Sequence, residues 1–148
     1  MTRDVLIRIS GQQAMDGDEH NVEVIITGDY FFKNGKHYVV YDEMMEELEG
    51  SVHNTVKITR DRMDIQKNGA IGAHMVFELD KKRQTRYATP LGDMVVDLTT
   101  TRIDLVEQED NIKVSVEYSL GINYQHISDN SIIIDIWSRQ KAQLKLRR

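Results

Sequence analysis

Apolar and polar residues alternate along most of this chain, as they do in β-strands that bury one face and expose the other. The longest alternating run covers residues 112–124. Its apolar positions are Ile112, Val114, Val116, Tyr118, Leu120, Ile122 and Tyr124. Shorter runs begin at Val5, Val22, Ile71 and Ile132, and residues 93–106 are rich in Val and Thr, which favour strands. No segment has a long apolar stripe with the period of a helix, so the pattern predicts an all-β protein.

Turn signals separate these runs at short intervals. Asn34-Gly35 lies between two runs, and this dipeptide readily takes the positive φ values of a type I′ hairpin turn. Asn68-Gly69 gives the same signal. Other clusters of turn-forming residues cover positions 16–18, 59–61, 80–82, 109–111 and 128–130. Short sequential strands with this spacing predict an antiparallel meander.

The only proline of the chain, Pro90, stands in the segment RYATPLG at residues 86–92. The four residues from Thr89 to Gly92 fit a type I turn, with Pro at the second place and Gly at the fourth. Because Pro cannot donate a hydrogen bond to a sheet, it belongs between strands. The segment is therefore interpreted as a bend and not as a substrate-binding loop.

Residues 41–50, YDEMMEELEG, allow two interpretations. They are good helix formers with Gly50 placed as a C-terminal stop, which would give two helical turns. The residues before them, Tyr38 to Tyr41, favour an extended chain. The favoured prediction is a strand that runs through Met45 into a loop.

A meander of about eight strands must protect its two edges. Closure into an up-and-down antiparallel β-barrel does this completely. The interior of such a barrel is filled by side chains or holds one small ligand. A sandwich of two sheets is the alternative architecture.

Composition is that of a globular protein. The chain has 148 residues, 40% of them apolar and 29% charged, which is enough for one domain with a core of its own. No apolar run approaches the ~18 residues of a transmembrane helix, and the first ten residues lack the features of a signal peptide. Cysteine is absent, which excludes disulfides and thiolate metal sites. We expect a cytoplasmic protein that does not associate with membranes.

Charge divides the chain into a domain at residues 1–138 and a basic tail at 139–148. The tail, RQKAQLKLRR, holds five basic residues and no acid, whereas residues 1–138 carry 14 basic and 24 acidic residues. An acidic body argues against nucleic acid as a partner. The favoured interpretation of the tail is a solvated segment, and contact with an acidic partner is the alternative.

Several motifs follow one another along residues 3–138. They are Thr27-Gly28-x-Tyr30, Tyr38 to Tyr41, Asn68-Gly69, Met75-x-Phe77, Tyr87-x-Thr89-Pro90-x-Gly92, the threonines 99–101 before Ile103, and Ile112-x-Val114-x-Val116-x-Tyr118. Together they resemble the bacterial YwiB-like family, and this resemblance implies a calycin-like, lipocalin-like β-barrel. The family has no known function, so the resemblance assigns no catalytic residue.

The sequence offers no metal, cofactor or nucleophile motif. Its five histidines show no ligand spacing, and the acidic segment 16–19 lacks the later residues of a calcium loop. Neither a G-x-S-x-G motif nor a Gly-rich phosphate fingerprint is present. We predict no catalytic residue, no metal and no cofactor.

A basic cluster at residues 81–87, KKRQTRY, offers four cations and one aromatic side chain. Such a cluster could bind a phosphate backbone. The favoured interpretation is that these charges flank a hairpin and protect it from edge-to-edge pairing.

Polar side chains that point into a barrel either pair with one another or orient a ligand. The candidate ligand-binding residues are Tyr87, Thr101, Arg102, Tyr118 and Tyr124. Strand alternation over 93–106 places Thr100, Arg102 and Asp104 on one face and Thr101 on the other. Arg102 inside would clamp a carboxylate or phosphate, but outside is favoured for a charged residue. Tyr118 and Tyr124 are expected to be buried.

Three functions stay open. The first is a barrel that binds a small apolar or amphipathic ligand in its interior. The second is a packed barrel whose surface and tail bind a protein partner, a nucleic acid or a second copy. The third, an enzyme, has the least support. A cavity of several hundred cubic ångströms would favour the first, and a filled interior the second.

Overall fold

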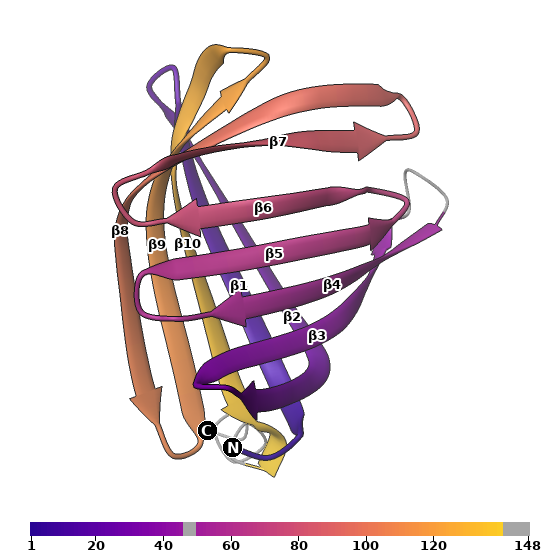
Figure 1. The fold of residues 1–148 in the computed structure, drawn as a ribbon, viewed down its shortest axis with the longest axis vertical. Coiled ribbons are helices and arrows are strands. Elements are labelled where there is room, and N and C mark those ends of the chain that lie inside the picture. Colours follow the sequence, from indigo (N-terminus) through magenta and orange to yellow (C-terminus); the bar gives the residue numbers. More distant parts are fainter. Residues whose placement is uncertain (46–49, 141–148) are drawn as a thin grey trace.

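The computed structural model describes residues 1–45 and 50–140, and within them the chain forms ten strands and no long helix (Figure 1). The strands are β1 (Asp4–Met15), β2 (Asp18–Lys33), β3 (Lys36–Met45), β4 (Gly50–Ile58), β5 (Arg62–Gly69), β6 (Ala73–Glu78), β7 (Lys82–Thr89), β8 (Gly92–Gln108), β9 (Asn111–Ile122) and β10 (Gln125–Ser138). The all-β prediction is confirmed, but the count is ten strands and not about eight. The short polar strands β4, β5 and β7 lack long apolar alternation, which is why the pattern undercounts.

The strands form one antiparallel sheet in the order β6-β5-β4-β3-β2-β1-β10-β9-β8-β7. The two ends of this sheet, β6 and β7, meet through an isolated bridge between Gly72 and Ala88, so the barrel is nearly closed. Long strands from β8 to β2 form one wall, and β3 to β6 cross in front of it (Figure 1). We call the end with the 109–110 turn and Met1 the base, and the end with the 16–17 and 123–124 turns the mouth.

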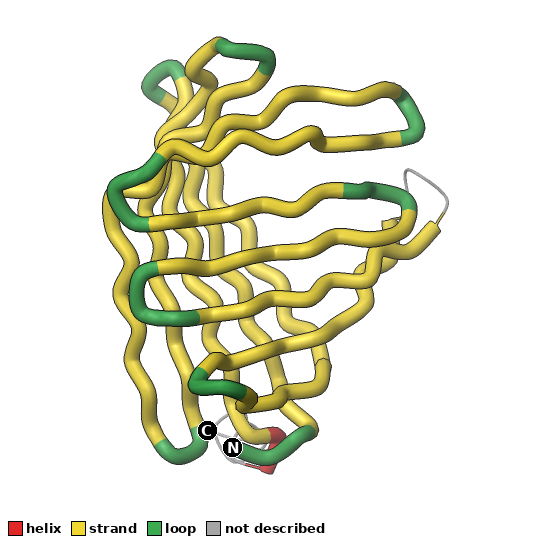
Figure 2. Tube along the Cα trace, in the orientation of Figure 1, coloured by secondary structure: helices red, strands yellow, loops and turns green. Residues whose placement is uncertain are grey.

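Two-residue turns join several strands as predicted (Figure 2). Asn34 and Gly35 have φ values of 53° and 74°, as a type I′ turn requires. The Pro90 segment forms the β7–β8 hairpin, where the Thr89 hydroxyl donates to the Gly92 carbonyl at 2.7 Å and accepts from the Leu91 amide at 3.2 Å. The predicted bend is confirmed.

The turn prediction at Asn68-Gly69 is wrong. Gly69 lies at the end of β5 and pairs with Val52, and the chain turns at residues 70–72. Gly69 has a φ of 136°, and a Cβ there would collide with the Ser51 carbonyl. Gly69 therefore permits the close approach of β5 to β4 and does not form a hairpin turn.

The turn prediction at 128–130 is also wrong, because these residues lie within β10. The chain turns instead at Asn123 and Tyr124, whose φ values are 50° and 70°. The Asn123 amide donates to the Val95 carbonyl at 2.8 Å, and its side-chain oxygen accepts from the Val95 amide at 3.1 Å. These bonds to β8 fix the turn at Asn123, a residue that tolerates positive φ.

Two further predictions concern segments at the limit of the described chain. β3 runs to Met45, which confirms the extended part of the 41–50 segment, and residues 46–49 lie outside the described residues. After Ser138 only Arg139 and Gln140 of the predicted tail are described, as a short helical turn. No helix in the described ranges is long and apolar enough to cross a membrane.

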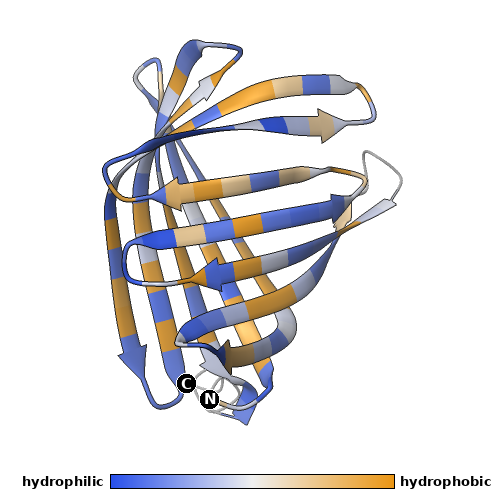
Figure 3. Ribbon diagram, viewed as in Figure 1, coloured by the Kyte–Doolittle hydropathy of each residue, from blue (hydrophilic) through white to orange (hydrophobic). Residues whose placement is uncertain are grey.

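The core fills the base. Apolar and polar residues alternate along the long strands (Figure 3), and the apolar set points inward. Completely buried core residues are Val5, Ile7, Val39, Val56, Ile58, Met63, Val114 and Ile136. The Ser138 amide donates to the Asp110 carbonyl at 3.0 Å and so ties the end of β10 to the 109–110 turn.

Candidate functional site at the mouth of the barrel

The barrel opens where β2 and β3 separate. Within the described residues, β3 pairs only with residues 29–33 of β2. On the other side of β2, the whole of β1 pairs with residues 18–29. Gly28 stands where the two strands diverge: a Cβ there would lie 2.6 Å from the Val40 carbonyl oxygen. Among the described residues, no strand therefore covers the inner face of β2 beyond Gly28.

Apolar side chains at this opening point inward but remain in solvent. Val24 lies opposite Ile9, and Val22 lies opposite Gly11, so both share the face of the core residue Ile7. Val22 is nevertheless 63% exposed and Val24 44% exposed. The alternation predicted the strand, but it did not predict that its apolar face would be uncovered.

A cavity of about 260 Å³ lies against this inner wall. Its lining from the inward faces of β1, β2, β9 and β10 comprises Gly11, Gln13, His20, Val22, Tyr118, Leu120, Asn130 and Ile132. Gly11 leaves room here, because a Cβ at this position would meet only the Ser131 carbonyl at 3.9 Å. The cavity therefore combines an apolar side with a polar side.

The polar side centres on Tyr118. Its cross-strand neighbours are Thr100 on β8 and Asn130 on β10, and its ring packs edge-to-face on Phe77 at 4.8 Å. Burial raises the pKa of Tyr118, and a hydrogen bond with the Asn130 side chain partly offsets this effect. Tyr118 thus stays a neutral phenol that divides the filled core from the mouth.

Two buried oxygens beside Tyr118 lack hydrogen-bond partners among the described residues: Thr100 Oγ1 and Asn130 Oδ1. Such a group costs about 1–3 kcal/mol when it is cut off from water. Nearby Gln13 and Ser128 do pair, with Nε2 donating to Oγ at 3.1 Å. Asn130 lines the cavity, so this unpaired oxygen belongs to a residue of the cavity wall.

A second polar cluster faces the interior from β3, β4 and β5. The Lys67 ammonium donates to Asn54 Oδ1 at 2.9 Å and lies 3.4 Å from the Glu43 carboxylate, to which Asn54 also donates. Burial, then the charge of Glu43, raises the pKa of Tyr41 to about 12, and the same two causes raise the pKa of Tyr87. The opposite wall is therefore polar as well, but its groups satisfy one another.

The structure separates the five predicted ligand residues. Tyr87 and Tyr118 face the interior, whereas Thr101, Arg102 and Tyr124 do not. Tyr124 is 74% exposed in the turn it forms with Asn123, so the expectation that it is buried is wrong. Burial of Tyr118 is partial.

A β-bulge at Thr101 explains why the two predicted ligand residues of β8, Thr101 and Arg102, do not face the interior. The register shifts between Thr100 and Arg102, so Thr101 is the extra residue. Thr100 is completely buried and points inward, and Arg102 points outward and pairs with Asp104 at 2.6 Å. Arg102 is outside as favoured, but the prediction that Thr100 and Arg102 share a face is wrong.

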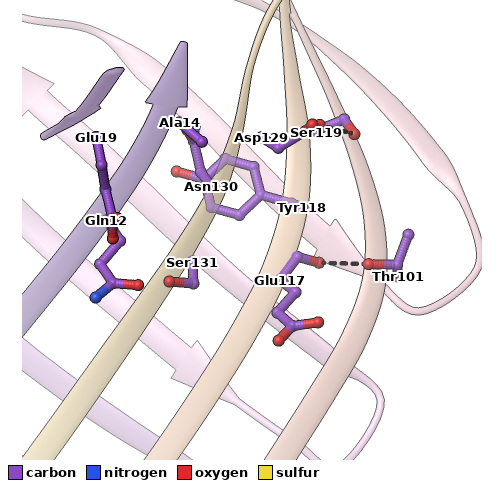
Figure 4. A pocket seen from close by; sticks show the side chains of 10 residues that line it. All are labelled: Gln12, Ala14, Glu19, Thr101, Glu117, Tyr118, Ser119, Asp129, Asn130 and Ser131. Atoms are coloured by element: carbon purple, nitrogen blue, oxygen red, sulfur yellow. Dashed lines mark hydrogen bonds between the residues drawn. The ribbon is translucent and has the colours of Figure 1, made fainter. Parts of the chain in front are cut away.

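Thr101 instead borders a depression on the outer surface (Figure 4). Its hydroxyl donates to the backbone carbonyl of Glu117 at 3.3 Å. The depression has a volume of about 390 Å³, and the carboxylates of Glu19 and Asp129 belong to residues that line it. In the part of the chain that the structure describes, no three His, Asp or Glu side chains are arranged to hold a metal ion. We regard this depression as the weaker candidate because its unbonded polar groups face solvent.

Basic residues 81–86 are neutralised by acidic neighbours. Glu78 pairs with Lys81 at 3.0 Å and with Arg83 at 2.6 Å. Asp93 pairs with Arg86 at 2.6 Å, and Asp97 lies 3.9 Å from Lys82. This pairing agrees with the hairpin interpretation, in which the cations serve the hairpin and not a phosphate backbone.

The residues that make the cavity amphipathic carry no clear signal in the sequence. Asn130 was assigned to a turn, Gly11 carries no motif, and Val22 and Val24 looked like core. Only the strand alternation of 5–9 and 22–26 could have placed Gly11 and Val22 on the inner face.

Comparison with known proteins identifies relatives of unknown function. A family model described as "Domain of unknown function (DUF1934)" matches residues 7–134. The uncharacterized beta-barrel protein YwiB of Bacillus subtilis is 25% identical over 119 residues, which cover 79% of this chain and 82% of the relative. The crystal structure of the ywiB protein from Bacillus subtilis has a TM-score of 0.83 at 20% identity and covers 92% of both chains. This likeness confirms the fold.

Proposed function

This chain belongs to the DUF1934 family of YwiB-like β-barrels, as its motifs predicted, and we propose that the mouth of its barrel binds a small amphipathic molecule. The family has no assigned function, so the proposal rests on the mouth itself. A calycin-like container in the cytoplasm, as the sequence predicts, is part of this proposal.

One observation carries the proposal: an unpaired buried oxygen and uncovered inward apolar side chains surround the same cavity. Asn130 Oδ1 lacks a hydrogen-bond donor among the described residues, and Val22 and Leu120 supply the apolar surface of the cavity. A ligand with a donor group and an apolar body would satisfy both, and each methylene it buries is worth about 0.8 kcal/mol. We infer a donor headgroup towards Asn130 and an apolar body towards β2.

The size of the cavity limits the ligand. About 260 Å³ is just below the ~300–1,000 Å³ of most ligand pockets, which favours a small molecule. Because the base is filled by core side chains, the ligand would lie at the mouth and not along the barrel axis. Tyr118 would form the floor of the site. Tyr87, Thr101, Arg102 and Tyr124 stay predicted ligand residues without a place in this cavity.

A protein, a nucleic acid or a second copy bound through the surface and the basic tail is the alternative. The pairing of the basic residues 81–86 with acids gives it no support, and most of the tail lies outside the described residues.

Native mass spectrometry of the gently purified protein, compared with its denatured mass, tests the proposal. We expect a non-covalent mass excess in the wild type that falls in Val22→Asp, which places a charge in the cavity. Val106→Asp is the matched control, because Val106 is an exposed valine on the outer face of β8.

A neutral fluorescent probe, N-phenyl-1-naphthylamine, covers the case in which the ligand is lost on purification. The same order of binding is expected: wild type and Val106→Asp alike, Val22→Asp weaker. No mass excess and no difference in probe binding between the two variants would overturn the proposal.

A further inference from the structure

A second cavity, of about 370 Å³, lies at the rim of the base, outside the packed core and at the opposite end of the barrel from the mouth. It is formed where β2 ends, β3 begins and the β8–β9 turn closes. Its lining includes Tyr30, Phe32, His37, Glu107 and Ile112. None of these residues lines the mouth cavity, so the two sites are independent.

Three side chains in this cavity form a hydrogen-bonded series. His37 Nε2 lies 2.8 Å from Glu107 Oε1, and His37 Nδ1 lies 2.7 Å from the Tyr30 hydroxyl. An ionised carboxylate only accepts, so Nε2 donates to Glu107; with a single proton on the ring, Nδ1 accepts from the Tyr30 hydroxyl. Burial, then the charge of Glu107, raises the pKa of Tyr30, which keeps the phenol protonated and able to donate.

This series leaves hydrogen-bond acceptors, and not donors, for a bound molecule. The Tyr30 oxygen gives its only proton to His37 and retains its lone pairs. Among the described residues Glu107 Oε2 has no hydrogen bond, and its side chain is about half exposed. Of the residues that line the cavity, Gln108 adds one side-chain amide, which can both donate and accept.

The remaining walls are apolar and include an aromatic ring. Phe32 is 62% exposed, and its ring centroid lies 5.1 Å from that of His37. Ile112 and the Met1 side chain complete the apolar surface. A cation over an exposed aromatic face gains about 0.5–1 kcal/mol.

Charge at the base favours a cation. Glu107 and Glu109 supply two carboxylates, and the Met1 ammonium, which donates to the Glu109 carbonyl at 2.9 Å, supplies one positive charge. Among the described residues that line the cavity, carboxylates therefore outnumber ammonium groups.

We propose that the base cavity binds an apolar primary amine in its ammonium form. The ammonium would donate to Glu107 Oε2 and to the Tyr30 oxygen, and the apolar body would lie on Phe32 and Ile112. His37 is a positioning residue: it holds the carboxylate and the phenol at a fixed separation and uses up the only phenol proton. An anionic carboxylate or phosphate is disfavoured, because its oxygens would face the Glu107 carboxylate and the lone pairs of the Tyr30 oxygen.

Titration with 2-phenylethylamine, monitored by NMR chemical shifts of the full chain, tests the proposal. Two matched probes of similar shape control for apolar binding: neutral 2-phenylethanol and anionic 3-phenylpropanoate. The amine is expected to bind at least about tenfold more tightly than either, as charge-assisted hydrogen bonds require. Shifts should concentrate at Phe32, Ile112 and their neighbours.

Single substitutions test which side chains of the base cavity bind the amine. Glu107→Gln removes the charge at constant shape and should weaken amine binding about tenfold while leaving the alcohol unchanged. Glu109→Gln is the matched control, because its side chain makes no hydrogen bond to His37, and it should have a smaller effect. Tyr30→Phe removes one acceptor only and tests the proposal if Glu107→Gln fails to fold.

The results separate this site from the mouth. Val22→Asp should leave amine binding at the base unchanged. Equal binding of the three probes, or full amine affinity in both Glu107→Gln and Tyr30→Phe, would overturn the proposal without bearing on the mouth.

Discussion

The base and the mouth of the barrel are built from the same long strands, yet one is packed and the other is open. At the base the inward residues of β1, β9 and β10 share one core cluster with residues of β3 to β6, and Val5, Val114 and Ile136 are completely buried. At the mouth the inward positions of β2 lose their covering strand after Gly28. Inward orientation is thus set by the strand, but burial is set by what crosses in front of it.

The largest test of this contrast uses one substitution at two inward valines. Val114→Ala at the base should lower the free energy of unfolding by about 2–3 kcal/mol, since it removes buried methyl groups and leaves a cavity. Val22→Ala at the mouth should change it by less than about 0.5 kcal/mol, because the side chain is already exposed. Urea unfolding measures both, and equal losses would show that the mouth is covered in solution.

The polar wall of the interior should make the stability of the protein depend on pH, through the buried side chain of Tyr41. Tyr41 has its pKa raised to about 12 by burial and Glu43, against about 10 when unfolded. Above pH 10 the unfolded chain loses this proton first, so stability is complete below pH 10 and falls by about 2 kcal/mol as the pH rises towards 12. Tyr41→Phe should remove much of this fall. An alkaline unfolding curve that is unchanged in the variant would contradict it.

The point of divergence can be tested with two glycines. A Cβ at Gly28 would lie 2.6 Å from the Val40 carbonyl oxygen and 2.7 Å from Ile7 Cδ1, so Gly28→Ala should cost about 1–2 kcal/mol. Gly11→Ala meets only the Ser131 carbonyl at 3.9 Å and should be neutral or stabilise by about 0.5 kcal/mol. Gly11→Ala should also weaken ligand binding, because it narrows the cavity. Thermal unfolding of both variants measures the difference, and a loss at Gly11 equal to that at Gly28 would disprove it.

Local features of the fold could be predicted from the sequence, because alternation and turn chemistry act over a few residues. The Asn34-Gly35 turn, the Pro90 bend and the strand through Met45 all follow from such signals. The turn at Asn123 did not, since it depends on hydrogen bonds to Val95 far along the chain.

The candidate site could be predicted only in part, for the same physical reason. Tyr118 faces the interior as predicted, but the bulge at Thr101 reversed the expected face of Arg102 relative to Thr100. The Glu43–Asn54–Lys67 cluster joins three strands through register, and no local pattern reports a register. Nor does alternation show that β3 leaves β2 at Gly28.

The smallest predicted effect concerns the unpaired hydroxyl of Thr100. This residue is completely buried beside Tyr118, and Oγ1 has no partner among the described residues. Thr100→Val keeps the shape and removes the unpaired group, so it should raise the free energy of unfolding by about 1 kcal/mol. The matched control is Thr55→Val on β4, an only partly buried threonine whose side chain lies on the outer face. A loss of stability in Thr100→Val, with none in the control, would mean that water or a ligand from the mouth reaches this hydroxyl, and the border between the two halves would then lie deeper than Tyr118.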